Sequence, residues 1–175
     1  LVELKPNRGA SVAYPTLEEA RDVFEVRRGL ERLVAESLAG RITAAQVTEL
    51  EAHVRQEEKA HEQDGPESIR LSGEFHIKLA KMTGNALLLR YVQEASSRCS
   101  LILAIYGRPH SSECAVSEHR QLIDALRDGD AARAADLMDH HLRSVVTRAL
   151  LTPRVERDIR DVLAPYALSE GLNPS

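Results

Sequence analysis

The chain has 175 residues, of which 43% are hydrophobic and 29% charged, and its formal net charge of -4 gives no bulk attraction to nucleic acid or anionic membranes. This length suits one domain with a sizeable core. Aromatic residues make up only 3% and Trp is absent, while Leu, Ala, Glu and Arg abound, which favours helices over a β-sandwich or barrel.

The first 15 residues differ from everything that follows. Residues 2–4 and 10–13 flank a Pro-Asn-Arg-Gly turn, and this pattern predicts two short strands. An isolated two-stranded ribbon is only marginally stable. We therefore expect residues 1–15 to be the end of a domain that is otherwise absent from this sequence.

From Thr16 onward the periodicity is helical. Capping boxes at Thr16 with Glu19 and at Thr43 with Gln46 predict the starts of two helices. We expect the second to fray in the charged stretch 55–59 and to end before an Asp-Gly-Pro break. Further helices are predicted over 66–84, 85–106, 115–127 and 131–151, with an amphipathic segment from 152. This order predicts an all-α antiparallel bundle of six to seven helices.

Two cysteines without a CxxC motif suit a reducing compartment. The sequence has no secretory signal and no apolar run near the roughly 18 residues that a membrane helix needs. These features predict a cytoplasmic protein without a membrane partner.

Three histidines lie on the apolar stripes of three different predicted helices: His76, His119 and His141. By the i, i+3, i+4 rule all three imidazoles point inward. A single one is more often a core histidine satisfied by a backbone carbonyl or hydroxyl, but three together favour a metal or ligand pocket. Zinc, nickel, copper or iron would suit imidazole ligands, and three of them leave coordination positions open.

The remaining histidines carry less signal. His53 and His61 lie at the polar end of the second predicted helix, and we expect both at the surface. His110 falls in a loop. His140 is about 100° around the helix from His141 and could replace it only if the helix is rotated.

Two further residues have two interpretations each. Arg27 lies on a buried line of the first helix, where it can pair with Glu31 at i, i+4 or anchor a carboxylate effector through its guanidinium fork. The first interpretation is favoured. Asn85 follows Gly84 and precedes an apolar run, so capping of the next helix is favoured over an effector contact.

The motifs in order resemble the effector-binding C-terminal domain of GntR-type bacterial transcription regulators, in the FCD subgroup. The hairpin of residues 5–13 looks like the wing of the family's winged helix-turn-helix. The other matching elements are Val26-Arg27-Arg28-Gly29-Leu30-Glu31, Phe75-His76, Gly84-Asn85-x-x-Leu88, and the helix pair that carries His119 and, 22 residues later, His141. No single element is specific, but the ordered series is.

The resemblance implies an antiparallel helical bundle that often holds a divalent metal on one Asp and three His. The three His correspond to His76, His119 and His141, while the Asp position is Ser72. Glu74 is no simple substitute, because it points about 200° away from His76. The site could hold metal on three His with water or effector completing the shell, bind it weakly, or be metal-free. We favour the first, with zinc ahead of nickel or another transition metal.

The leading hypothesis is the sensor and dimerisation domain of a one-component transcription regulator, a homodimer that contacts DNA only through the missing winged helix domain. A divalent ion on neutral ligands would attract an anionic effector, so a small organic acid is expected, with Arg27, Ser72 and Asn85 as candidate contacts. The alternatives are a structural dimerisation domain with a relic pocket and a helical metalloenzyme. The enzyme is disfavoured because the only ExxH motif, Glu58 to His61, lies in a charged stretch.

Overall fold

The computed structural model describes residues 2–5, 9–61, 66–106 and 113–150. This part of the chain holds a two-stranded sheet followed by six helices. The elements in chain order are β1 (Val2–Lys5), β2 (Gly9–Val12), α1 (Leu17–Leu38), α2 (Ala44–His61), α3 (Pro66–Met82), α4 (Ala86–Tyr106), α5 (Glu113–Asp128) and α6 (Ala131–Leu150). The predicted all-α bundle is confirmed.

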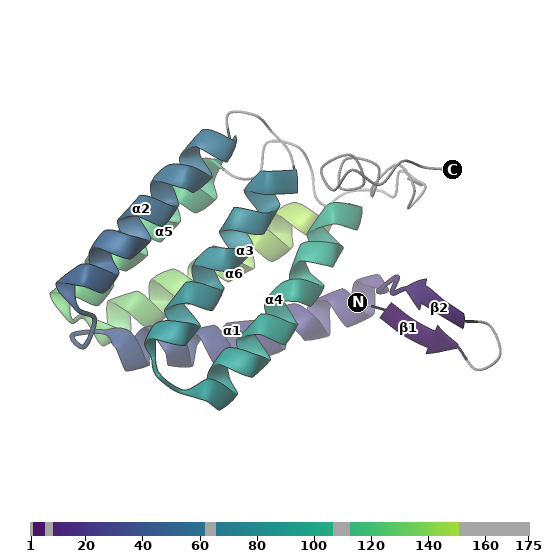
Figure 1. Ribbon diagram of the computed structural model, residues 1–175, viewed down its shortest axis with the longest axis horizontal. Helices are drawn as coiled ribbons and strands as arrows, with labels where there is room; N and C mark the ends of the chain where they lie inside the picture. Colours follow the sequence, from purple (N-terminus) through teal and green to yellow (C-terminus); the bar gives the residue numbers. More distant parts are fainter. Residues whose placement is uncertain (1, 6–8, 62–65, 107–112, 151–175) are drawn as a thin grey trace.

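The six helices form a closed ring in which each packs mainly against two neighbours, with smaller contacts of α1 with α3 and of α4 with α6. Around the ring the order is α1, α6, α5, α2, α3, α4 and back to α1 (Figure 1). Helices α1 and α2 therefore lie opposite each other, although they follow each other in the chain. Each helix turns one stripe of side chains toward the centre, and this arrangement allows distant parts of the sequence to meet there.

Local signals explain where the helices begin and turn. Thr16 caps α1, because its hydroxyl accepts from the backbone N–H of Glu19 while the Glu19 carboxylate accepts from the N–H of Thr16. Gly40 and Gly129 have φ of 70° and 76°, and their turns touch each other. The Gly40 N–H donates to the Leu126 carbonyl over 3.1 Å, and a Cβ on Gly129 would lie 3.4 Å from the Gly40 Cα.

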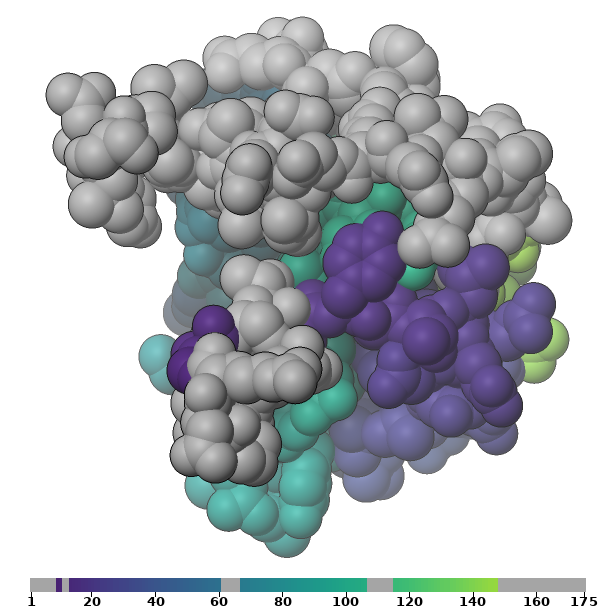
Figure 2. All heavy atoms as spheres, turned by 90° about the vertical axis from the view of Figure 1, so that its right-hand side faces the viewer, coloured from purple at the N-terminus to yellow at the C-terminus, as the bar shows by residue number. Residues whose placement is uncertain are grey.

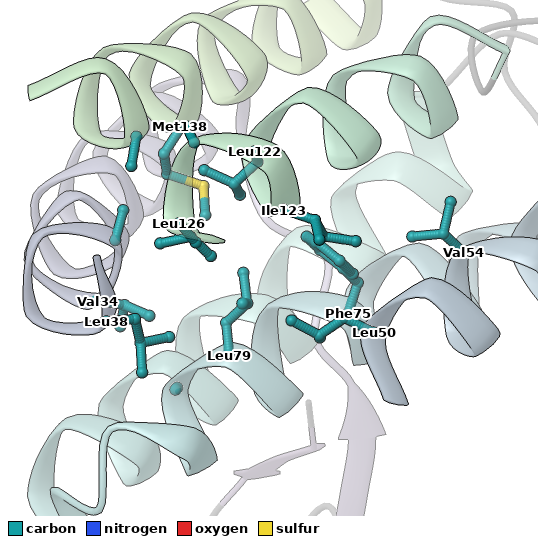
Figure 3. Packing of buried hydrophobic residues seen from close by; sticks show 14 of the residues in the cluster. Val34, Leu38, Leu50, Val54, Phe75, Leu79, Leu122, Ile123, Leu126 and Met138 are labelled. Carbon is teal, nitrogen blue, oxygen red and sulfur yellow. The ribbon is translucent and has the colours of Figure 1, made fainter. Parts of the chain in front are cut away.

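The interior has two apolar clusters and a group of buried polar side chains. The larger cluster draws on all six helices, and its labelled side chains point toward one another in Figure 3. The smaller one contains Phe24, Cys99 and Ile102. Along α1 the buried stripe passes from Phe24 through two charged residues to Val34. We call the buried polar residues that contact one another around the histidines the polar layer: Arg27, Glu31, His53, Glu57, His76, His119 and His141.

The β-hairpin pairs antiparallel with Val2 opposite Val12, and it projects from the bundle beyond the start of α1 (Figure 1). Figure 2 shows α1 and α4 side by side at this end. The last turn of α4 holds the connection, since the Tyr106 hydroxyl donates to the Pro15 carbonyl over 2.9 Å. The Tyr14 and Tyr106 rings meet edge to face at 6.4 Å.

Apart from the second helix, the predicted helix boundaries agree with the structure to within two residues. The expected fraying of the second helix is wrong, because α2 continues to His61. The amphipathic segment expected from 152 lies outside the described residues. Within the described ranges, no helix combines the length and apolarity needed to cross a membrane.

Candidate metal centre

Three helices bring the predicted histidines to one point in the polar layer. His76 comes from α3, His119 from α5 and His141 from α6, and their exposed fractions are 2%, 1% and 3%. Each lies on the apolar stripe of its helix, so burial of the flanking leucines and valines carries the imidazole inward. The structure thus brings the three imidazoles together, as the helical spacing predicted.

The Nε2 atoms of the three rings face one another. His141 Nε2 lies 3.3 Å from His119 Nε2 and 3.2 Å from His76 Nε2. Each ring thus offers one nitrogen that lies within 4.8 Å of a nitrogen on both other rings. Two nitrogens bound to one zinc ion at 2.0–2.1 Å with a tetrahedral angle are about 3.3 Å apart. Two of the three pairs have this spacing.

Each imidazole is held from behind by a glutamate. The Nδ1–H of His119 donates to Glu57 over 2.8 Å, that of His141 donates to Glu118 over 2.6 Å, and that of His76 donates to Glu31. Metal-binding histidines commonly donate their second nitrogen to a carboxylate in this way. With the proton on Nδ1, each Nε2 carries a lone pair directed toward the other two.

Three lone pairs that face one another cannot hydrogen-bond among themselves. A proton shared between the rings is disfavoured. Burial lowers the pKa of His76 to about 3 and that of His141 to about 4. The neighbouring Glu31 and Glu118 oppose these shifts but do not cancel them. Both rings are therefore neutral near pH 7. A metal cation would satisfy all three acceptors, so the donor set fits a transition metal that accepts imidazole.

Arg27 belongs to the same network one step further from the centre. Its Nε donates to Glu31 over 2.5 Å, and both side chains are buried, which confirms the favoured interpretation of a buried i, i+4 pair. Burial would raise the pKa of Glu31, but the positive charge of Arg27 outweighs it and holds that pKa at about 2. The Cys99 thiol is buried near Arg27, and this burial raises the pKa of the thiol.

Glu57 and His53 are residues that the sequence interpretation missed. His53 was expected at the surface, but it is only 4% exposed. Its Nε2–H donates to the Leu71 carbonyl over 2.8 Å and lies 3.3 Å from Glu57 Oε1. The signal was available, because Val47, Leu50, Val54 and Glu57 continue one stripe at helical spacing.

Glu57 is ionised although it is buried. Burial raises its pKa, but the hydrogen bond from His119 and the nearby His53 ring more than offset this effect and bring the pKa to about 2. Its Oε2 accepts a hydrogen bond from His119. Its Oε1 accepts none within the described part of the chain. The carboxylate is thus positioned to accept a hydrogen bond from His119, although this position leaves its second oxygen without one from the described residues.

Phe75 fixes the plane of one ring. Its side chain stacks on His119 with the ring centroids 3.9 Å apart and an interplanar angle of 13°. Phe75 precedes His76 in α3, so two consecutive residues serve the centre: one as a candidate ligand and the other as a support for the ligand from α5.

The other candidate residues lie at varying distances from this centre. Ser72 is half-buried on α3, one turn before His76. Asn85 is exposed and caps α4, with its Oδ1 accepting from the N–H groups of Leu87 and Leu88 over 3.1 Å. His140 is exposed, so α6 presents His141 as predicted. The side chain of His61 and all of His110 lie outside the described part.

A family model described as FCD domain matches residues 22–144, which is well over half of the chain and includes all three histidines. The chain belongs to the FCD domain family. The ordered motifs had predicted this membership, including the subgroup within the GntR-type regulators.

Similar proteins agree with the FCD assignment. The HTH-type transcriptional repressor RspR of Escherichia coli (strain K12) is 25% identical over 149 residues, which cover 83% of this chain and 64% of that protein. The HTH-type transcriptional regulator YdfH of Shigella flexneri matches to the same extent. The chain thus spans less than two thirds of the length of these curated relatives.

Solved structures show the same bundle. Streptococcus agalactiae GntR is 28% identical with a TM-score of 0.64, over 83% of this chain and 73% of that one. E. coli McbR/YncC has a TM-score of 0.73 at 14% identity, over 94% and 74%, and this likeness concerns the fold alone. By their names, RspR is a transcriptional repressor and YdfH a transcriptional regulator, and neither name describes an enzyme.

Proposed function

We propose that this FCD domain is the sensor and dimerisation domain of a cytoplasmic, DNA-binding transcription regulator, and that it holds a divalent metal on His76, His119 and His141. Zinc suits three imidazole ligands best, and nickel is the next candidate. A small organic acid is the proposed effector, bound at the open positions of the metal. One observation carries the proposal: three buried Nε2 lone pairs face one another while each Nδ1–H is taken by a carboxylate.

The attraction of an anionic effector needs a different reason from the one the sequence suggested. The sequence argument counted only neutral ligands around a divalent ion. The described surroundings also include the carboxyl groups of Glu31, Glu57 and Glu118 and the guanidinium of Arg27. These carboxyl groups oppose the positive charge of a divalent ion. A carboxylate is then recruited by direct coordination and not by a net positive field.

Arg27, Ser72 and Asn85 contribute unequally to this proposal. Ser72 lies one turn before His76, at the position of the Asp in the family pattern, and its hydroxyl carries no charge. An oxygen of the effector could therefore occupy the coordination position that the Asp carboxylate would fill. Arg27 is paired with Glu31, and its contact with an effector stays a prediction. Asn85 is exposed at a helix start, where capping accounts for its side chain.

Signal output depends on how the domain is attached to DNA-binding elements. We propose that the β1–β2 hairpin is the wing of a winged helix-turn-helix domain, and that two copies of the chain form the dimer. An effector changes DNA affinity only if it binds the two arrangements of the DNA-binding heads unequally.

The metal is tested with a pair of neighbouring histidines. Protein purified without chelator is analysed for bound metal by elemental analysis and native mass spectrometry, together with His141→Ala and His140→Ala. We expect wild-type protein and His140→Ala to carry about one metal per chain, and His141→Ala to have lost it. Equal metal content in the two variants would contradict the metal proposal. So would the absence of bound metal from every sample after zinc or nickel has been added.

The effector is tested separately by calorimetry. Metal-loaded and metal-stripped protein are titrated with a panel of small carboxylic and sugar acids. We expect binding only to the loaded form, because the effector completes the coordination shell. Binding of equal strength to both forms would place the effector elsewhere.

A second candidate function is a structural dimerisation domain with a relic pocket, which the serine at position 72 favours. Replacing Ser72 with Asp restores the carboxylate that the family pattern has there. A large gain in zinc affinity indicates that the geometry of the site persists. An unchanged, very weak affinity supports the relic.

A further inference from the structure

The three glutamates behind the histidines come from three different helices. Glu31 is on α1, Glu57 on α2 and Glu118 on α5, and each accepts from the Nδ1–H of one histidine. Helices α1 and α2 supply none of the three candidate ligands and lie on opposite sides of the ring. Through Glu31 and Glu57 both helices nevertheless reach the centre.

These contacts differ from ordinary ion pairs of the same helices. Glu57 and His119 are 3% and 1% exposed, whereas the next residue on each helix forms the pair Glu58–Arg120 over 2.6 Å with about half of each side chain exposed. In the exposed pair, the carboxylate of Glu58 is already paired with the positive charge of Arg120. The buried pair keeps a carboxylate away from water with an imidazole as its hydrogen-bond partner, and burying a carboxylate costs stability unless a cation is near.

We propose, on the basis of the metal site proposed above, that Glu31, Glu57 and Glu118 form a carboxylate shell around the three candidate ligands. The shell has two tasks. It holds each imidazole with its proton on Nδ1, so that Nε2 is free to bind, and it supplies the negative charge that balances a divalent ion. The three glutamates are positioning residues, because each acts through a histidine.

Glu57 offers the sharpest test because its neighbour is a matched control. Glu57→Gln removes the charge, and Glu58→Gln removes an exposed charge that links the same two helices. Zinc affinity is measured by competition with a chromogenic chelator. We expect Glu57→Gln to bind zinc about 10- to 100-fold more weakly, the usual effect of losing such a partner, and Glu58→Gln to match wild type. Glu57→Asp, which keeps the charge on a shorter side chain, should recover part of the loss.

The tautomer is read without any metal. In protein stripped of metal and labelled with ¹⁵N on its histidines, the ring nitrogen shifts distinguish the Nδ1–H from the Nε2–H form. We expect the Nδ1–H form for His119 in wild type and in Glu58→Gln, with a changed proportion in Glu57→Gln. A purely structural role of Glu57 would leave this signature unaltered in the folded variant.

The outcomes separate this proposal from the metal site itself. Equal zinc affinity of Glu57→Gln and Glu58→Gln, or an Nε2–H form of His119 in wild type, overturns the carboxylate shell. Absence of zinc binding in wild type overturns the metal site and the charge balance together, while the histidine spectrum still decides whether Glu57 orients His119. If Glu57→Gln does not fold, Glu118→Gln, whose side chain is 16% exposed, is measured with His141 as the reporter.

Discussion

The larger apolar cluster and the polar layer are neighbouring parts of one interior, but they are built on different rules. In the apolar cluster, residues such as Leu126 and Met138 are fully buried and need only shape and volume from their neighbours (Figure 3). In the polar layer, Glu31 needs Arg27 and His76, and Glu57 needs His119. One part tolerates conservative changes of its residues, and the other depends on specific partners.

This difference indicates what each part contributes. Buried apolar side chains stabilise a fold by about 1.5–3 kcal/mol each. Buried ion pairs often stabilise no better than apolar residues of the same size, because removing charges from water is costly. We infer that the apolar clusters stabilise the bundle, and that the polar layer serves binding. The predictions below test this division.

The largest expected effect on stability comes from the apolar cluster. Leu126→Ala removes a fully buried side chain about 10 Å along α5 from His119. We expect the free energy of unfolding to fall by about 2–5 kcal/mol, while the folded fraction keeps wild-type zinc affinity. Chemical denaturation and a zinc titration measure the two quantities. A loss of affinity that matches the loss of stability would show that the two parts are not separate.

Removal of the metal should act on the polar layer alone. A ligand that binds only the folded state at 100 times its dissociation constant stabilises that state by about 2.7 kcal/mol. We expect a chelator to lower the melting temperature of wild type, while helical circular dichroism below the transition stays the same. His141→Ala provides the control, since the chelator should leave its melting temperature unchanged. Unfolding of wild type by the chelator at room temperature would instead make the metal a part of the fold.

A smaller effect is expected where neither part is involved. Thr16→Ala removes the hydroxyl of the capping box at the exposed start of α1, at a cost of about 1 kcal/mol. Zinc affinity should equal that of wild type, which thermal denaturation and titration can check side by side. A tenfold change in affinity would mean that the start of α1 is coupled to Glu31 further along that helix.

The amino-acid sequence by itself determined the helices and the inward direction of the histidines. Capping boxes and glycines mark helix ends through local backbone hydrogen bonds, and the 3.6-residue period assigns each residue to a face. For this reason His76, His119 and His141 could be singled out, and His141 preferred over His140, before any contact between helices was known.

The partners of those histidines were decided by the tertiary structure. Glu31 meets His76 across 45 positions of sequence and Glu57 meets His119 across 62, and periodicity contains no information about which stripes face each other. His53 was expected at the surface and Glu57 in a fraying charged stretch, because polar and charged side chains normally face water. Their burial depends on α2 closing the ring between α3 and α5, where the ionised carboxylate has His119 beside it. A charged residue can be buried only where the packing of other helices supplies its partner, and packing between helices is a property of the whole fold.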